Sequence, residues 1–164
     1  MTVRTVLRMG DPRLLQPAAP VTAFGTPELA ALVDDLFDTM AAEGGVGIAA
    51  PQIGVGLRAF SWHIDGETGY VLNPVLDRVD GEPAEIDEGC LSVPGLWFPT
   101  KRYPYARVVG TDLDGAEVVL EGEGLMAQML QHECDHLDGT VYVDTLAKEH
   151  RREALRQIRA SDWF

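Results

Sequence analysis

The stretch from Leu125 to Leu137 decides the fold, and its sequence is LMAQMLQHECDHL. Leu125, Met129 and Leu130 provide apolar positions that fit a helix. We therefore predict one helix over this stretch. Each residue of a helix turns about 100° from the one before it, so His132 and His136 lie about 40° apart, on one face and one turn apart.

Two histidines placed in this way can share one metal ion. Glu133 falls about 60° from His136, beside the ligands, where it can reach a water held by the ion. Cys134 falls about 160° from His136, and the same geometry excludes it as a ligand of that ion. Two histidines on an ordinary helix near the surface are the alternative, and a third ligand would decide between the two interpretations.

Several residues compete to be this third ligand. One class of metalloproteases has a histidine six residues after the second histidine, but this chain has Tyr142 there. Another class uses a glutamate on a later helix, for which Glu149 and Glu153 are candidates. We favour Cys90, within Glu88-Gly89-Cys90-Leu91-Ser92, because a thiolate and two imidazoles leave a fourth position open for water. A buried structural thiol is the alternative for Cys90.

A glycine-rich segment from Gly45 to Gln52, with the sequence GVGIAAPQ, is the third motif. Gly-x-Gly followed by small residues indicates backbone that packs tightly against a neighbour. Gln52 is a neutral donor that could polarise a carbonyl group, or an ordinary loop amide. A phosphate-binding loop is a weak alternative, because no Gly-Lys-Ser/Thr ending follows.

The rest of the chain predicts an α+β fold. A helix should begin at Thr26-Pro27-Glu28 and end near residue 43, before Gly44-Gly45. A second helix, exposed and basic, should cover Ala147 to Arg159. The middle of the chain predicts two hairpins, each with an Asp-Gly turn, from strands at Leu57–Ile64, Gly69–Asn73, Tyr105–Thr111 and Glu117–Glu121.

Length and composition narrow the class of protein. The 164 residues, without repeats or linkers, predict a single domain over residues 1–164. The net charge of −13 argues against broad nucleic-acid binding. No apolar run approaches the roughly 18 residues of a membrane span, and charged residues interrupt the first 20 positions, so we expect no membrane contact and a cytoplasmic location. With no export signal, metal ligation or a buried thiol is a better expectation for the two cysteines than a disulfide.

Together the three motifs resemble those of bacterial peptide deformylases. Members of that family carry a glycine-rich segment ending in glutamine, then Glu-Gly-Cys-Leu-Ser, then His-Glu-x-Asp-His. The same motifs occur here in order, at Gly45–Gln52, Glu88–Ser92 and His132–His136, and the similarity in length and spacing extends over nearly the whole chain. The resemblance implies antiparallel or mixed sheets around a central helix that carries the last motif, with a C-terminal helix behind them.

The resemblance also implies an activity, the removal of the formyl group from N-formylmethionine on newly made polypeptides. Cys90, His132 and His136 would bind one divalent ion, usually iron(II), with zinc, nickel or cobalt as substitutes. Glu133 would be the general acid and base. Gln52 and the backbone N–H of Leu91 would donate to the formyl oxygen. Val46 and Gly47 would pair with the substrate backbone like an added strand.

Other assignments rest on weaker patterns. Leu125 and Met129 share a helix face with His132 and could line the methionine pocket, or they could be core residues. Gln128 lies near that face where the family usually has an aliphatic residue. Trp97 stands near the place of an arginine that contacts substrate in many relatives, so selectivity beyond methionine could differ, although a core role for Trp97 is equally plausible.

Two further hypotheses concern charged residues. Glu88, Arg102 and Asp135 could form a buried network that orients the ligands, or be ordinary surface charges. The basic C-terminal helix could dock on ribosomal RNA, or be an ordinary solvated helix. Its basic residues are Lys148, Arg151, Arg152, Arg156 and Arg159.

We expect a monomer. A catalytically silent relative is the remaining alternative, against which intact Glu133 and Gln52 argue.

Overall fold

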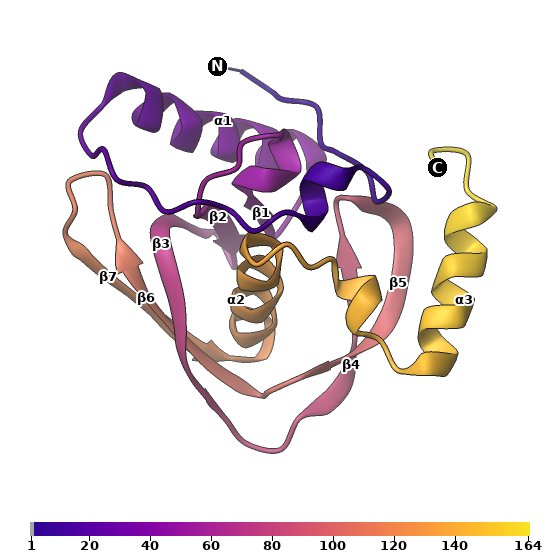
Figure 1. Ribbon diagram of the computed structural model, residues 1–164. Coiled ribbons are helices and arrows are strands. Elements are labelled where there is room, and N and C mark those ends of the chain that lie inside the picture. The colour runs from indigo at the N-terminus through magenta and orange to yellow at the C-terminus, as the bar shows by residue number, and fades with distance from the viewer. Residues whose placement is uncertain (1) are drawn as a thin grey trace.

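A computed structural model describes residues 2–164 of the chain (Figure 1). The fold is α+β, with two antiparallel sheets arranged around α2 and a helix at the C-terminus. In chain order the elements are η1 (Pro12–Leu15), α1 (Pro27–Glu43), β1 (Gly47–Ala49), η2 (Ala50–Ile53), β2 (Ala59–Ile64), β3 (Glu67–Asp80), β4 (Ala84–Cys90), β5 (Val93–Arg102), β6 (Tyr105–Thr111), β7 (Glu117–Glu123), α2 (Gly124–Leu137), η3 (Tyr142–Thr145) and α3 (Lys148–Arg159).

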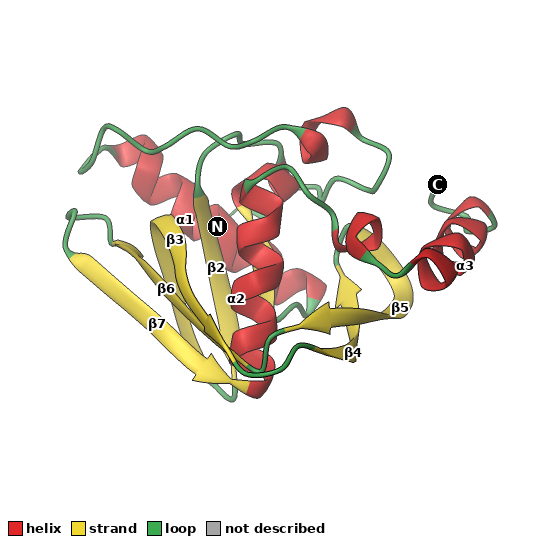
Figure 2. Cartoon of the chain, turned by 60° about the horizontal axis from the view of Figure 1, so that its bottom comes forward, coloured by secondary structure: helices red, strands yellow, loops and turns green. Residues whose placement is uncertain are grey.

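The larger sheet has the order β1-β2-β3-β6-β7, and all its neighbouring strands are antiparallel. β4 and β5 form a separate two-stranded sheet. Figure 2 shows α2 between the two sheets, with α3 beyond the β4–β5 hairpin. This arrangement brings the end of β4 beside the C-terminal half of α2.

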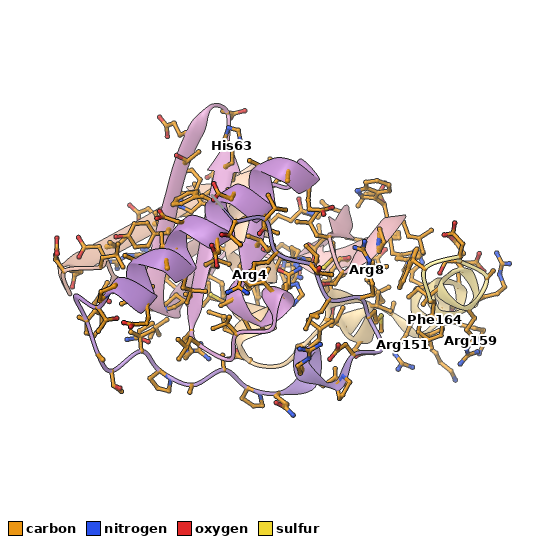
Figure 3. The ribbon with its side chains drawn as sticks, turned by 90° about the horizontal axis from the view of Figure 1, so that it is seen from above. Arg4, Arg8, His63, Arg151, Arg159 and Phe164 are labelled. Atoms are coloured by element: carbon orange, nitrogen blue, oxygen red, sulfur yellow. The ribbon has the colours of Figure 1, made fainter. Side chains whose placement is uncertain are left out.

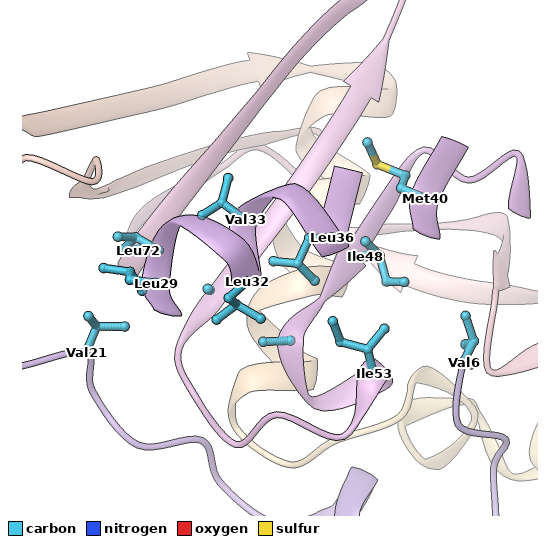
Figure 4. Close-up of a cluster of buried hydrophobic side chains, with 12 residues drawn as sticks. Val6, Val21, Leu29, Leu32, Val33, Leu36, Met40, Ile48, Ile53 and Leu72 are labelled. Atoms are coloured by element: carbon cyan, nitrogen blue, oxygen red, sulfur yellow. The ribbon is translucent and has the colours of Figure 1, made fainter. Parts of the chain in front are cut away.

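Alternation along the strands places α1 and α2 on opposite faces of the larger sheet. Ile48, Ala59 and Leu72 pack in the cluster under α1, drawn in Figure 4. Their neighbours along the strands, among them Ala49 and Phe60, pack in the cluster with α2. One face of the larger sheet therefore packs against α2 and positions the helix that carries the two histidines.

The ends of α1 follow the predicted signals. The Thr26 hydroxyl accepts a hydrogen bond from the backbone N–H of Leu29 at 3.2 Å, which caps the first turn. Gly44 closes the helix with φ of 67°, in the left-handed region that glycine adopts without strain. Both boundaries of the predicted helix are confirmed.

Three expectations need correction. β3 continues to Asp80, beyond the predicted end at Asn73. The β4–β5 hairpin was not expected, because four of the first five residues of β4 are exposed and give no apolar alternation. The last helix is not exposed on all sides, since Ala154 and Ile158 are buried against the rest of the fold. Among residues 2–164, no helix combines the length and the apolar character that crossing a membrane would require.

Candidate metal centre

Three side chains from two elements converge beside α2. His132 and His136 lie one turn apart on α2, and Cys90 is the last residue of β4. The pairing of β4 with β5 is irregular between Gly89 and Cys90, where the register shifts. Such irregularities re-aim a side chain at the end of a strand, and here the thiol faces the histidines.

Two of the distances between the three ligand atoms are close to those of a tetrahedral site. The Nε2 atoms of His132 and His136 are 3.2 Å apart, and Cys90 Sγ lies 3.4 Å from His136 Nε2. Tetrahedral bonds of ordinary zinc-like length would give about 3.3 Å between nitrogens and about 3.6 Å between sulfur and nitrogen. All three atoms lie within 4.8 Å of one another. The donor set fits one divalent cation with a fourth position left over.

A buried ion-pair network orients His132. Glu88 Oε2 lies 2.8 Å from His132 Nδ1, which leaves Nε2 of that ring free to act as a ligand. Arg102 donates to both oxygens of Glu88 and also to Asp135 at 2.8 Å. Burial alone would raise the pKa of Glu88, but hydrogen bonds from Arg102 and His132 outweigh it and lower that pKa to about 2. The predicted Glu88–Arg102–Asp135 network is therefore present.

Glu133 lies beside the ligands, and within residues 2–164 no ion pair includes it. The residue is 3% exposed, and its Oε2 finds no hydrogen-bond partner among the described residues. Burial raises the pKa of Glu133 to about 7. A carboxyl group that can gain or lose a proton near neutral pH is suited to general acid and base work.

The glycine-rich segment packs tightly against this site, as its sequence predicted. A Cβ atom at Gly47 would lie 2.8 Å from Glu133 Oε1, and one at Gly45 would lie 2.8 Å from Leu91 Cδ1. Both distances are too short for non-bonded atoms, so a side chain at either position would force Glu133 or Leu91 to move. The segment thereby packs closely against the carboxyl of Glu133 and against the Cys90 loop.

Gln52 is buried behind the ligands, at the end of the same segment. Its Oε1 accepts from the backbone N–H of Ala49 at 2.9 Å. Its Nε2 donates to Ser92 Oγ at 3.1 Å and lies 3.7 Å from Cys90 Sγ. The sequence had suggested no partner for Ser92, because residues 40 positions apart meet only through the fold.

A cavity of about 440 Å³ opens onto this site. Its walls include most of the predicted substrate residues, namely Val46, Gly47, Leu91, Leu125 and Met129, together with Cys90, His132 and Glu133. Gln52 and His136 do not line it. The cavity also touches residues that sequence reasoning had not assigned to it, including Glu43, Asp87, Pro94 and Gly95.

Two residues that depart from the family pattern also line the cavity. Trp97 is 64% exposed, which rules out a core role, and its indole lies over Gly89 of the paired strand. Gln128 donates to the backbone oxygen of Asp87 at 2.9 Å and so ties α2 to β4. Tyr142 stands where one class of metalloproteases has a histidine ligand. Its ring packs against that of His132, with 5.7 Å between the ring centroids.

The alternative ligands are not at the site. Within residues 2–164, Cys90, His132 and His136 form the only group of three or more such side chains placed to hold a metal. Glu153 instead pairs with Arg156 on α3. Cys134 is buried away from the cluster, and burial raises the pKa of its thiol to about 12.

Comparisons with known proteins agree with this geometry. A family model described as polypeptide deformylase matches residues 3–152. The chain belongs to the polypeptide deformylase family. A peptide deformylase of Acidothermus cellulolyticus is 48% identical over 163 residues, which cover 99% of this chain and 89% of that protein. The crystal structure of a peptide deformylase from Legionella pneumophila superimposes with a TM-score of 0.91 at 40% identity, covering 97% of this chain and 95% of that one. The deformylase from Thermus thermophilus gives 0.88, also at 40% identity, with 96% and 94% covered.

Proposed function

We propose that this deformylase removes the formyl group from N-terminal formylmethionine of newly made polypeptides and releases formate. The observation that carries the proposal is a thiolate and two imidazoles spaced for one cation, with the unpaired carboxyl of Glu133 beside them in the cavity wall. The family assignment supports the same reaction.

Cys90, His132 and His136 would hold the divalent cation. When bound, it lowers the pKa of a water molecule and polarises a carbonyl oxygen. Glu133 takes a proton from the water that attacks the formyl carbon. When the C–N bond breaks, Glu133 returns that proton to the amine nitrogen, so formate and a free N-terminus leave.

Gln52 and the Leu91 backbone N–H would stabilise the charge that develops on the formyl oxygen. Each preorganised donor of this kind is worth about 3 kcal/mol. The fixed orientation of the Gln52 amide supports the role, because its Oε1 accepts from Ala49 while its Nε2 donates to Ser92 Oγ and lies 3.7 Å from Cys90 Sγ.

The cavity would hold the methionine side chain and the start of the peptide. Leu125 and Met129 would provide the apolar wall, and Val46 and Gly47 would pair with the substrate backbone. Val46 is 37% exposed in the cavity wall, which supports its place beside the substrate, and because its backbone oxygen accepts from the N–H of His63 at 2.8 Å, the substrate would pair with its N–H.

Iron(II) is the metal that we propose, with zinc, nickel or cobalt as substitutes in isolated protein, because a thiolate ligand suits iron(II) and makes the site sensitive to oxygen. Metal analysis of anaerobically prepared protein tests this. Iron-loaded enzyme that kept its activity for days in air would contradict it.

We also propose that residues 1–164 act as a single, monomeric domain in the cytoplasm, and that α3 docks on ribosomal RNA. Arg151 and Arg156 already pair with Asp144 and Glu153, so the docking charge would come from Lys148, Arg152 and Arg159. Replacing these three with glutamate spares the buried face of α3, which truncation would not. Unchanged ribosome co-sedimentation of this variant at low salt would remove the idea.

Formate release from formyl-Met-Ala-Ser, with and without a chelator, tests the activity directly. We expect release that the chelator abolishes and that added metal restores. Cys90→Ala should lose both metal and activity, whereas Cys134→Ala should keep both. A Cys90→Ala protein that retained its metal would overturn the proposed ligand set.

A further inference from the structure

Arg8 contacts the loop that carries the proposed thiolate ligand. Its Nη1 donates to the backbone oxygen of Leu91 at 2.9 Å, although the two residues are 83 positions apart. Figure 3 shows Arg8 on the N-terminal segment, with Arg4 nearer the N-terminus on the same segment. The side chain is only partly exposed.

The peptide group that Arg8 contacts also contacts the sulfur. The oxygen of Leu91 and the N–H of Ser92 belong to one amide, and this N–H donates to Cys90 Sγ at 3.4 Å. A cation at the oxygen of an amide polarises it and makes its N–H a stronger donor. The charge of Arg8 therefore polarises the Leu91–Ser92 peptide group, whose N–H donates to the sulfur of Cys90.

Backbone hydrogen bonds on both sides hold Arg8 in this position. The N–H of Leu7 donates to the oxygen of Gln52 at 2.7 Å, and the N–H of Met9 donates to the oxygen of Ser92 at 2.8 Å. The N-terminal segment therefore connects the glycine-rich motif to the Cys90 loop, with Arg8 between the two connections.

We propose that Arg8 is a positioning residue of the metal centre, which withdraws electron density from the Cys90 thiolate through the Leu91–Ser92 peptide group. Hydrogen bonds to a ligating sulfur tune the electronic properties of the metal it binds. With Arg8 present, the sulfur donates less charge, and a bound cation remains a stronger Lewis acid. The proposal rests on the metal site of the proposed function.

Cobalt(II)-loaded protein gives a readout that does not depend on turnover, the sulfur-to-cobalt charge-transfer absorption. Arg8→Met removes the charge and keeps an apolar stem, so the sulfur becomes richer in electrons and the band should move to longer wavelength. Arg8→Lys, which keeps a cationic donor, should restore the band toward its original position. Arg8→Gln provides the same comparison if the methionine variant does not fold.

Arg4→Met is the matched control, because it removes the same charge from the same segment. Arg4 pairs with Asp35 at 2.8 Å, away from the site, and its variant should leave the band unmoved. An unmoved band in folded Arg8→Met or Arg8→Gln protein, or an equal shift in Arg4→Met, overturns the role of Arg8. Absence of the band from the unmodified protein would instead refute the metal site itself.

Discussion

The two long helices of this protein differ in the polar side chains that they bury. α1 buries five apolar residues and one threonine, namely Leu29, Leu32, Val33, Leu36, Met40 and Thr39. α2 buries Gln131, His132, Glu133 and His136 beside its apolar residues. Burying polar groups costs free energy unless they are paired. Gln131 is paired with the backbone of Tyr103 and so has a structural role. The difference indicates that α1 chiefly stabilises the fold, whereas α2 also carries His132, Glu133 and His136, whose burial the proposed metal site explains.

Glu133 carries the largest expected effect, because it is the buried carboxyl group that has no partner. Glu133→Gln should lower formate release by about 10²- to 10⁴-fold, the usual contribution of general acid and base catalysis. Metal content should not change, since glutamine preserves the shape of the side chain and the three ligands remain. A Glu133→Gln enzyme within tenfold of the original rate would show that another group moves the protons.

Leu36 provides the counterpart on α1, where it is completely buried in the apolar cluster of Figure 4. Leu36→Ala should reduce the free energy of unfolding by about 2–5 kcal/mol, through lost burial and the cavity left behind. Activity per folded, metal-loaded molecule should stay the same. Chemical denaturation together with the formate assay checks both, and a reduced turnover at full folding would mean that the two helices are coupled.

The sequence predicted α1, α2 and the pair of histidines because each depends on local spacing, whereas Cys90, 46 positions from His136, was predicted from the chemistry of its thiolate. The four-residue interval between His132 and His136 specifies one helix face, and Thr26 and Gly44 mark helix ends by their own chemistry. The β4–β5 hairpin was missed because its exposed, charged strand gives no apolar pattern. The contacts of Ser92 and Arg8 were missed for another reason, since their partners are distant in the chain and meet only after folding.

Glu88 tests the value of the pairing around α2. Glu88→Gln removes the carboxylate that orients His132. It also leaves the buried guanidinium group of Arg102 with Asp135 as its remaining acidic partner. Metal affinity should fall by about 10- to 100-fold, as is typical when a partner of a ligating histidine is lost. Competition with a chelator measures this, and unchanged affinity would mean that packing alone orients the ring.

Glu153 provides the matched control, because its pair with Arg156 has the same chemistry as that of Glu88 with Arg102 but lies in water. Hydrogen bonds from Arg156 and Gln157 lower the pKa of Glu153 to about 2, below its ordinary value of 4.5. The stabilisation is therefore complete above about pH 4.5 and is lost as the pH falls toward 2.

Glu153→Gln should leave metal affinity and activity unchanged. It should slightly reduce stability at neutral pH, and this difference should disappear in acid. Thermal unfolding of both proteins between pH 7 and pH 2 measures it. A loss as large as that of Glu88→Gln would contradict the comparison, because water screens an exposed ion pair and leaves it little net free energy.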